Sequence, residues 1–118
     1  MRIKDALSRI AAIKPSRYGD ELMVEWLSRI DETIRVEIMQ EGEGPLRYDA
    51  ATDMDKELLA PYPYDEIYIT WLQAQIDLNN AEMGRFNNDM LLYNTQYTSL
   101  CDWWIREHMP KQKNYVRV

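Results

Sequence analysis

Glycine and proline are gathered in a few places along this chain, and their distribution limits what it can fold into. Of the 118 residues, four are glycine and five are proline. Most of them fall in three clusters, at Pro15–Gly19, Gly42–Pro45 and Pro61–Pro63. Because both residue types interrupt helices, the stretches between the clusters remain free to be helical. The sequence therefore predicts helices joined at these clusters.

Apolar residues repeat with helical spacing in most of these stretches. A short stripe predicts an N-terminal helix over residues 3–13, which ends before Pro15. Longer stripes predict three principal helices, near residues 20–39, 65–79 and 83–108. The predicted fold class is all-α: a small helical bundle with a short N-terminal helix, three principal helices and a long loop between the first two long helices.

The last predicted helix carries a heptad stripe made of Phe86, Met90, Tyr93, Tyr97, Leu100 and Trp104. Such a stripe indicates a helix that packs at a shallow angle against another helix. Trp71 and Trp104 continue their stripes, so we expect both to be more buried than Trp103. Trp103 then either contacts a partner protein, as exposed aromatic side chains commonly do, or covers the bundle core.

The chain length favours one domain, predicted over residues 1–110 and followed by an extended tail over residues 111–118. Three basic residues and a terminal aromatic–valine group make the tail a candidate docking element. Its candidate partner-binding residues are Tyr115, Val116 and Arg117. The alternative is an ordinary chain end without a partner.

The segment over residues 40–63 has no helical period but contains several large apolar side chains. Loops of this length are usually functional or ordered by a partner. We therefore expect it to contact an adjacent subunit and to show fast amide exchange over residues 41–60 in the free protein. The alternative is an Ω-like wrap over its own core. The candidate partner-binding residues of this segment are Tyr48, Met54, Leu58, Leu59 and Tyr62.

Charge is distributed unevenly along the chain. The net charge is −6, with +4 over residues 1–18 and −10 over residues 20–66. An acidic middle disfavours unselective binding to nucleic acid, which depends on cations that neutralise phosphates. Within this region, the four-residue spacings Glu25–Arg29 and Asp31–Arg35 predict ion pairs on a solvated helix face.

No combination of residues points to catalysis or to a bound cofactor. Cys101 and His108, the single cysteine and the single histidine, are two turns apart on one helix, about 10 Å in rise, and cannot touch there. The ligand sets of zinc and di-iron sites and the lysine of a phosphate-binding loop are missing. We expect no catalytic, cofactor or metal site. The lack of a long apolar run or a leader peptide predicts a protein of a reducing cytoplasm, or of a particle assembled there.

Several runs of residues together resemble a known family. They are ELLAPYPYDEIY from Glu57, WLQAQID from Trp71, RFNN from Arg85 and WWIREHMP from Trp103, with DELMVEWLSRID in the first long helix. The pattern resembles the head-to-tail connector proteins, also called head completion or neck adaptor proteins, of tailed phages and prophages of Gram-positive bacteria. The resemblance covers about residues 18–110.

The resemblance implies an all-α adaptor that forms a homo-oligomeric ring on the phage portal protein. Such a ring extends the DNA channel and offers an attachment surface to stopper or tail-completion proteins, while genomic DNA passes without sequence-specific binding and no membrane is involved. The implied location is the virion neck, assembled in the bacterial host cytoplasm. A competing interpretation is a soluble interaction module, such as a dimeric regulator that uses the heptad stripe as its dimer seam.

Two positions depart from the family pattern. Asn80-Ala81 stands where a helix break containing glycine is expected, and Phe86 stands where tyrosine is usual. The sequence therefore leaves open whether the last two helices are separate or form one kinked rod.

Overall fold

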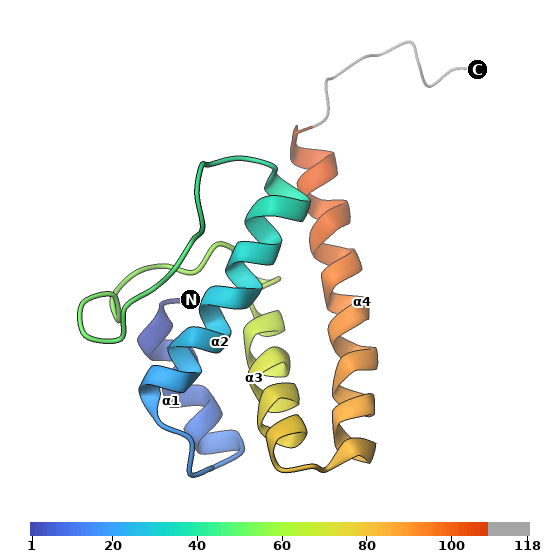
Figure 1. Cartoon of the computed structure of the whole chain (residues 1–118). Coiled ribbons are helices and arrows are strands. Elements are labelled where there is room, and N and C mark those ends of the chain that lie inside the picture. The colour runs from blue at the N-terminus through green and yellow to red at the C-terminus, as the bar shows by residue number, and fades with distance from the viewer. Residues whose placement is uncertain (109–118) are drawn as a thin grey trace.

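The computed structural model describes residues 1–108, which form helices joined by loops (Figure 1). The helices are α1 (Ile3–Ile13), α2 (Asp20–Thr33), α3 (Glu66–Asn79) and α4 (Met83–His108). A π-helical segment, η1 (Ile34–Met39), continues α2 to the end of the helix predicted over 20–39. No strand occurs within the described residues, and the all-α prediction is confirmed. None of the helices described is long and apolar enough to cross a membrane.

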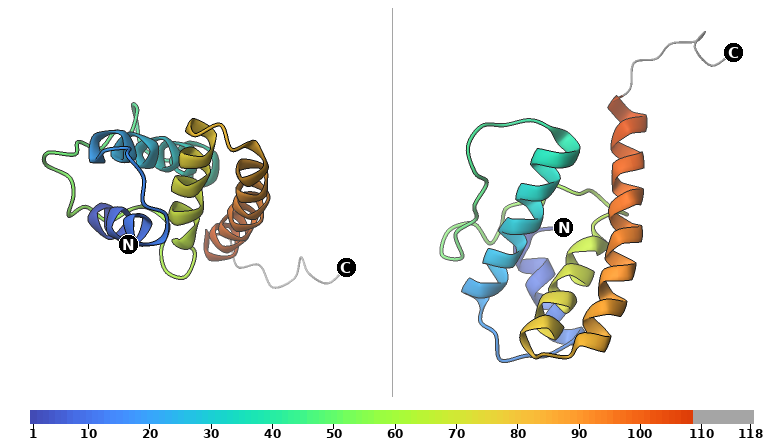
Figure 2. Two further views of the ribbon diagram at one scale, coloured as in Figure 1. Left: turned by 90° about the horizontal axis from the view of Figure 1, so that it is seen from below. Right: turned by 45° about the vertical axis from the view of Figure 1, so that its right-hand side comes forward.

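α3 lies at the centre of the bundle. It packs against α1 and α2 on one side and against α4 on the other (Figure 2). Its composition explains this place, because apart from Glu66 at its start and Asp77 near its end the helix carries only apolar or neutral side chains, on all of its sides. The indole of Trp71 also donates a hydrogen bond to the Trp26 carbonyl of α2, at 2.9 Å. The buried residues of α3 are Ile67, Tyr68, Ile69, Thr70, Leu72, Ala74, Ile76 and Asp77.

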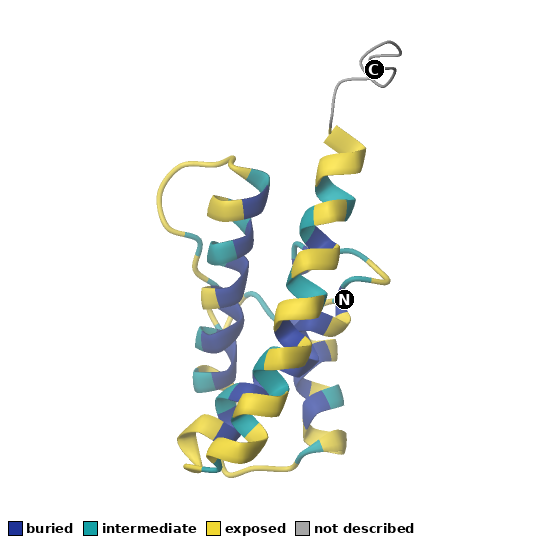
Figure 3. Ribbon diagram, turned by 90° about the vertical axis from the view of Figure 1, so that its right-hand side faces the viewer, coloured by how far each residue is buried: buried dark blue, intermediate teal, exposed yellow. Residues whose placement is uncertain are grey.

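α4 is an outer layer that contacts the domain mainly through one stripe. The predicted heptad forms this stripe: Tyr93 and Leu100 are buried, and its other members are half-buried. The ring of Tyr93 lies 5.2 Å from the ring of Trp71 on α3, measured between centroids. The opposite side of α4 is exposed for most of its length (Figure 3). The stripe is therefore a contact within the domain.

α3 and α4 are separate helices joined by a tight turn at Ala81. The Glu82 amide donates to the Asp77 carbonyl at 2.8 Å, and the Ala81 amide donates to the Leu78 carbonyl at 3.0 Å. These two bonds form a Schellman motif, which satisfies the last carbonyls of α3. The motif needs a left-handed residue after the cap, and Ala81 takes this conformation with φ of 59°.

Replacing Ala81 with glycine is expected to stabilise the protein. The left-handed conformation costs an L-residue about 1–2 kcal/mol, and glycine avoids this cost while losing ~0.4–1 kcal/mol through a more flexible unfolded chain. We expect a net gain of ~0.5–1 kcal/mol, seen as a melting temperature raised by roughly 2–5 °C. The same change in a right-handed helix, Ala11→Gly in α1, should lower it. Equal losses in both variants would contradict the prediction.

The segment between η1 and α3 wraps over the domain. The amides of Ile3 and Lys4, at the start of α1, donate to the carbonyls of Lys56 and Met54, both at 3.0 Å. The Leu58 amide donates to the Met1 carbonyl at 2.9 Å. Leu58 and Ala60 are buried in the core. The segment thus follows the Ω-like alternative, because its own domain supplies the contacts that we expected from a partner.

Candidate interaction surface

Hydrogen bonds to Asp31 of α2 hold the wrapped segment against the helices. The Asp31 carboxylate is fully buried and accepts hydrogen bonds from the hydroxyls of Tyr48 and Tyr68, each at 2.5 Å. The Leu59 amide donates to the same carboxylate at 3.1 Å. The Ala60 amide in turn donates to the Tyr68 hydroxyl at 2.7 Å. One carboxylate therefore connects α2, α3 and two points of the segment.

The environment of Asp31 suits a structural role. Burial raises the pKa of Asp31, and the hydrogen bonds from the two tyrosines and Leu59 act in the opposite direction. Burial also raises the pKa of Tyr48 and of Tyr68, so both phenols stay protonated and continue to donate. The arrangement holds a loop in place and leaves none of these groups free for a proton transfer.

The predicted solvated face of α2 is only partly correct. Arg29 pairs with Glu25 at 3.3 Å, as predicted. Arg35 pairs instead with Glu32, at 2.7 Å, because Asp31 points into the core. A signal for this was present in the sequence: Asp31 follows Leu27 by four residues and precedes Ile34 by three, so it lies on the apolar stripe.

The prediction that the loop residues bind an adjacent subunit needs correction. Leu58 is buried in the core, Leu59 and Met54 are half-buried against it, and Tyr48 is held by Asp31. These side chains are used inside the domain because residues 46–60 run back over α1 and α2. Fast amide exchange is therefore no longer expected for Tyr48, Leu58 or Leu59, whose amides are hydrogen-bonded.

Tyr62 remains available to a partner. It is 86% exposed, more than any other large apolar side chain among residues 1–108. Next to it in sequence, Tyr64 packs on Trp103 of α4 with ring centroids 5.6 Å apart. Arg106 donates to the Tyr64 hydroxyl at 3.4 Å. We call Tyr62, Tyr64, Trp103 and Arg106 the aromatic surface.

A small hollow of about 210 Å³ lies between the Pro63–Glu66 turn and α4. Its α4 wall consists of Thr95, Gln96 and Ser99, none of which is charged. A partner side chain of ordinary size would fit such a volume.

Trp71, Trp103 and Trp104 are all half-buried, so the predicted order of their burial is not seen. The remaining predicted residues, Tyr115, Val116 and Arg117, lie outside the described part of the chain.

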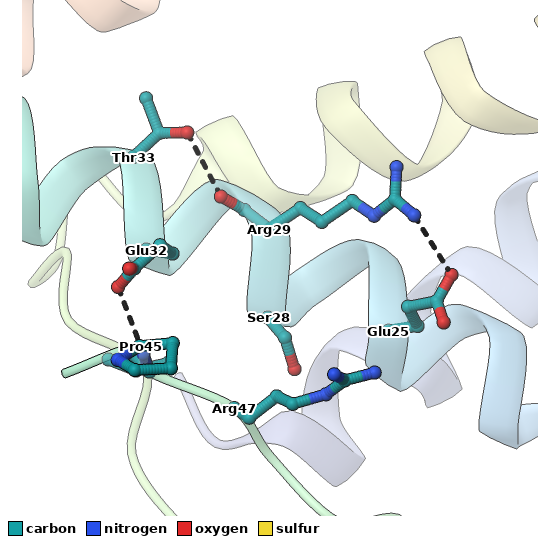
Figure 4. A pocket seen from close by; sticks show the side chains of 8 residues that line it. Glu25, Ser28, Arg29, Glu32, Thr33, Pro45 and Arg47 are labelled. Carbon is teal, nitrogen blue, oxygen red and sulfur yellow. Dashed lines mark hydrogen bonds and ion pairs between the residues drawn. The ribbon is translucent and has the colours of Figure 1, made fainter.

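A second, more open hollow of about 370 Å³ separates α2 from the Pro45–Arg47 stretch (Figure 4). Most of the polar groups that line this hollow form ion pairs or hydrogen bonds within the domain. Arg29 binds Glu25, and the Leu46 amide donates to Glu32 at 3.0 Å. The two hydroxyl groups of the lining, those of Ser28 and Thr33, donate to backbone carbonyls of α2.

Neither the single cysteine nor the single histidine lines one of these two hollows. Cys101 is half-buried on α4, and burial raises the pKa of its thiol. His108 is exposed near the end of α4, with its ring stacked on Trp104 at a centroid distance of 3.5 Å. Across residues 1–108, no three potential metal-binding side chains gather into a site.

The sequence analysis missed a carboxylate pair that joins α3 to α4. Asp77 is 2% exposed, forms an ion pair with Lys14 and shares a hydrogen bond with Asp89. Burial, and then the hydrogen bond and negative charge of Asp77, raise the pKa of Asp89 to about 7. Burial opposes the ionisation of Asp77, but its bonds with Asp89 and Lys14 outweigh this and lower its pKa. Arg85 contributes a further positive charge to both acids.

This pair predicts a loss of stability as the pH rises from about 4 to about 7. Below about pH 4, Asp89 is protonated in both states; between about pH 4 and pH 7 the unfolded chain releases the proton that the folded protein keeps, so the free energy of unfolding falls across this range and the loss is complete above the folded pKa. Asp89→Asn keeps the hydrogen bond without the charge. We expect it to raise the melting temperature by about 3–5 °C at pH 8, a value that allows for solvent screening of the half-exposed Asp89.

The control for this prediction is the same variant at about pH 4, where Asp89 is largely protonated in the folded state and only begins to ionise in the unfolded chain, so the melting temperatures of the two proteins should nearly agree. Thermal unfolding followed by circular dichroism measures both. A gain that is equal at about pH 4 and pH 8 would show that the charge of Asp89 is not its cause.

The comparisons with known proteins identify no relative: no protein-family model matches the chain, and no significant match was found among curated proteins or solved structures.

Proposed function

We propose that this chain is a non-enzymatic structural adaptor of a phage or prophage neck. In this role it forms an oligomeric ring on the portal, extends the DNA channel and provides an attachment surface for stopper or tail proteins. The observation that carries the proposal is the aromatic surface, in which Tyr62 is 86% exposed and Tyr64 packs on Trp103. The sequence resemblance over residues 18–110 supplies the identity of the assembly.

Aromatic and arginine side chains suit this role because they provide much of the binding energy in protein interfaces. Tyr64 and Trp103 pack on each other, so this part of the surface is already ordered before a partner binds. A pre-ordered surface loses little conformational entropy on binding. The aromatic surface is therefore a suitable anchor for the portal or for a stopper protein.

The charge distribution agrees with a channel through which DNA moves freely. The region over residues 20–66 carries −10, and its exposed acids include Glu21, Glu41 and Glu43. Such a surface repels phosphates on balance, because its acids outnumber its exposed cations Arg29, Arg47 and Lys56. The buried carboxylates Asp31 and Asp77 connect helices to one another, which suits a structural role.

The competing dimeric regulator loses its main support. That interpretation required the heptad stripe of α4 to face a second copy, but Tyr93 and Leu100 of the stripe are buried within the domain. A dimer through this stripe would require α4 to leave α3.

Retention of the protein by the portal encoded nearby tests the proposal. We expect immobilised portal to retain the full-length chain, and Tyr62→Ala to weaken retention at least ~10-fold, as loss of an interface anchor does. Ile13→Ala removes an exposed apolar side chain from α1 and is the matched control, with retention unchanged. Deleting residues 111–118 tests the predicted tail contact in the same assay. No retention of the wild-type chain would overturn the proposal.

A further inference from the structure

The outer side of α4 has a feature that the neck proposal does not use. From Asn87 to Ser99, none of its exposed residues is charged. Asp89, the one acid in this stretch, belongs to the pair with Asp77. The exposed residues are Asn87, Asn88, Leu91, Leu92, Asn94, Thr95, Thr98 and Ser99. For a chain with a net charge of −6, this is a surface on which two copies can meet without repulsion.

Six exposed residues form a second seam along this side. They are spaced three, four, three, four and three residues apart, the spacing of a helix that packs against another helix. At 100° per residue they fall within an arc of about 100° on the helix surface. All six are exposed, in contrast to the inner heptad. We call them the outer seam: Arg85, Asn88, Leu92, Thr95, Ser99 and Asp102.

The outer seam is complementary to itself when two copies run antiparallel. Its ends carry opposite charges, Arg85 at the start and Asp102 at the finish. An antiparallel partner places Asp102 of the second copy against Arg85, and the same contact repeats at the other end. The same alignment sets Asn88 against Ser99 of the second copy, two side chains that can share a hydrogen bond. A single antiparallel register therefore pairs opposite charges at both ends of the seam and places polar side chains opposite each other between them.

At the centre of this register, a leucine of the second copy lies next to the small hollow beside α4. Leu92 of the second copy faces Thr95, which with Gln96 and Ser99 forms the α4 wall of the 210 Å³ hollow. Leu92 is 51% exposed in the single chain, so it gains burial on pairing. The short side chains of Thr95 and Ser99 let the two helices approach closely.

We propose that the free protein pairs reversibly with a second copy of itself through the outer seams of two antiparallel α4 helices. The seam is about 27 Å long and ~10 Å wide, so each copy covers on the order of 300 Å². This is well below the ~800 Å² per partner of a stable complex, and the pair should therefore be weak and concentration-dependent. The proposal is independent of the neck function and describes the protein before any assembly.

Sedimentation equilibrium of the full-length chain tests the pairing. We expect the mass to rise from 14.1 kDa towards twice that value as the concentration increases. Thr95→Lys puts two like charges near the two-fold axis and should weaken pairing at least ~10-fold. Ala12→Lys adds the same charge to an exposed position of α1 and should leave pairing unchanged. A mass that stays at 14.1 kDa up to several hundred micromolar, or a Thr95→Lys variant that pairs normally, would overturn the proposal.

A charge exchange tests the antiparallel register. Arg85→Glu and Asp102→Arg should each weaken pairing by about 5–10-fold, because each puts like charges together at both ends of the seam. The double variant restores opposite charges and should recover pairing to within about threefold. Thermal unfolding checks each fold, since Arg85 also pairs with Glu82 at 3.1 Å. If the two losses add in the double variant, the register is wrong. Portal retention is measured separately, so that failure of one proposal leaves the other standing.

Discussion

Replacing Asp31 with alanine is expected to lower the free energy of unfolding by about 3 kcal/mol, a fall of ~15 °C in the melting temperature. The change leaves the hydroxyls of Tyr48 and Tyr68 and the amide of Leu59 without their acceptor. Removal of a partly desolvated carboxylate offsets some of this loss, which is why the value stays below the sum of three such bonds. Denaturant unfolding followed by circular dichroism measures the effect.

Asp55→Ala is the matched control, because Asp55 is an exposed carboxylate of the same segment with a surface ion pair to Lys4 at 2.6 Å. It should cost less than ~1 kcal/mol. Hydrogen exchange adds a local measurement: the amides of Leu59 and Ala60 should be protected in the wild-type protein and exchange faster in Asp31→Ala. Similar stabilities of the two variants would mean that the segment is held by its apolar contacts alone.

The second large effect is expected from Leu100 of α4. Leu100 is fully buried against the bundle, and its replacement with alanine should cost about 3 kcal/mol through lost burial and the cavity left behind. Leu91 is on the same helix but 68% exposed, so Leu91→Ala should cost less than ~0.5 kcal/mol. The pair of variants separates the inner stripe of α4 from its outer side.

The same experiment at several protein concentrations shows whether the inner stripe packs within one chain or between chains. Because the inner stripe packs within one chain, the loss in Leu100→Ala should be the same at every concentration. A loss that shrinks as the concentration rises would indicate that the stripe packs between chains, as in the dimeric regulator. Thermal unfolding over a hundredfold range of concentration distinguishes the two.

The sequence by itself determined the helices and their inner faces. The apolar spacing of α2 and α4 and the interrupting clusters at Pro15–Gly19 and Pro61–Pro63 act within one or two turns of chain, so they can be recognised without knowledge of the fold. For the same reason the inner heptad of α4 was predicted correctly. Tyr62, within the Pro61–Pro63 cluster, is exposed, and its selection as a partner-binding residue stays a prediction.

Only the tertiary structure decided how the long segment is held and which acids are buried. Asp31 lies 28 residues from Leu59 and 37 from Tyr68, and no local pattern connects them. The pairing of Asp77 with Lys14 and Asp89 likewise joins three separate parts of the chain. A carboxylate on an apolar stripe is stable only where distant donors meet it, and the positions of those donors are set by the packing of whole helices.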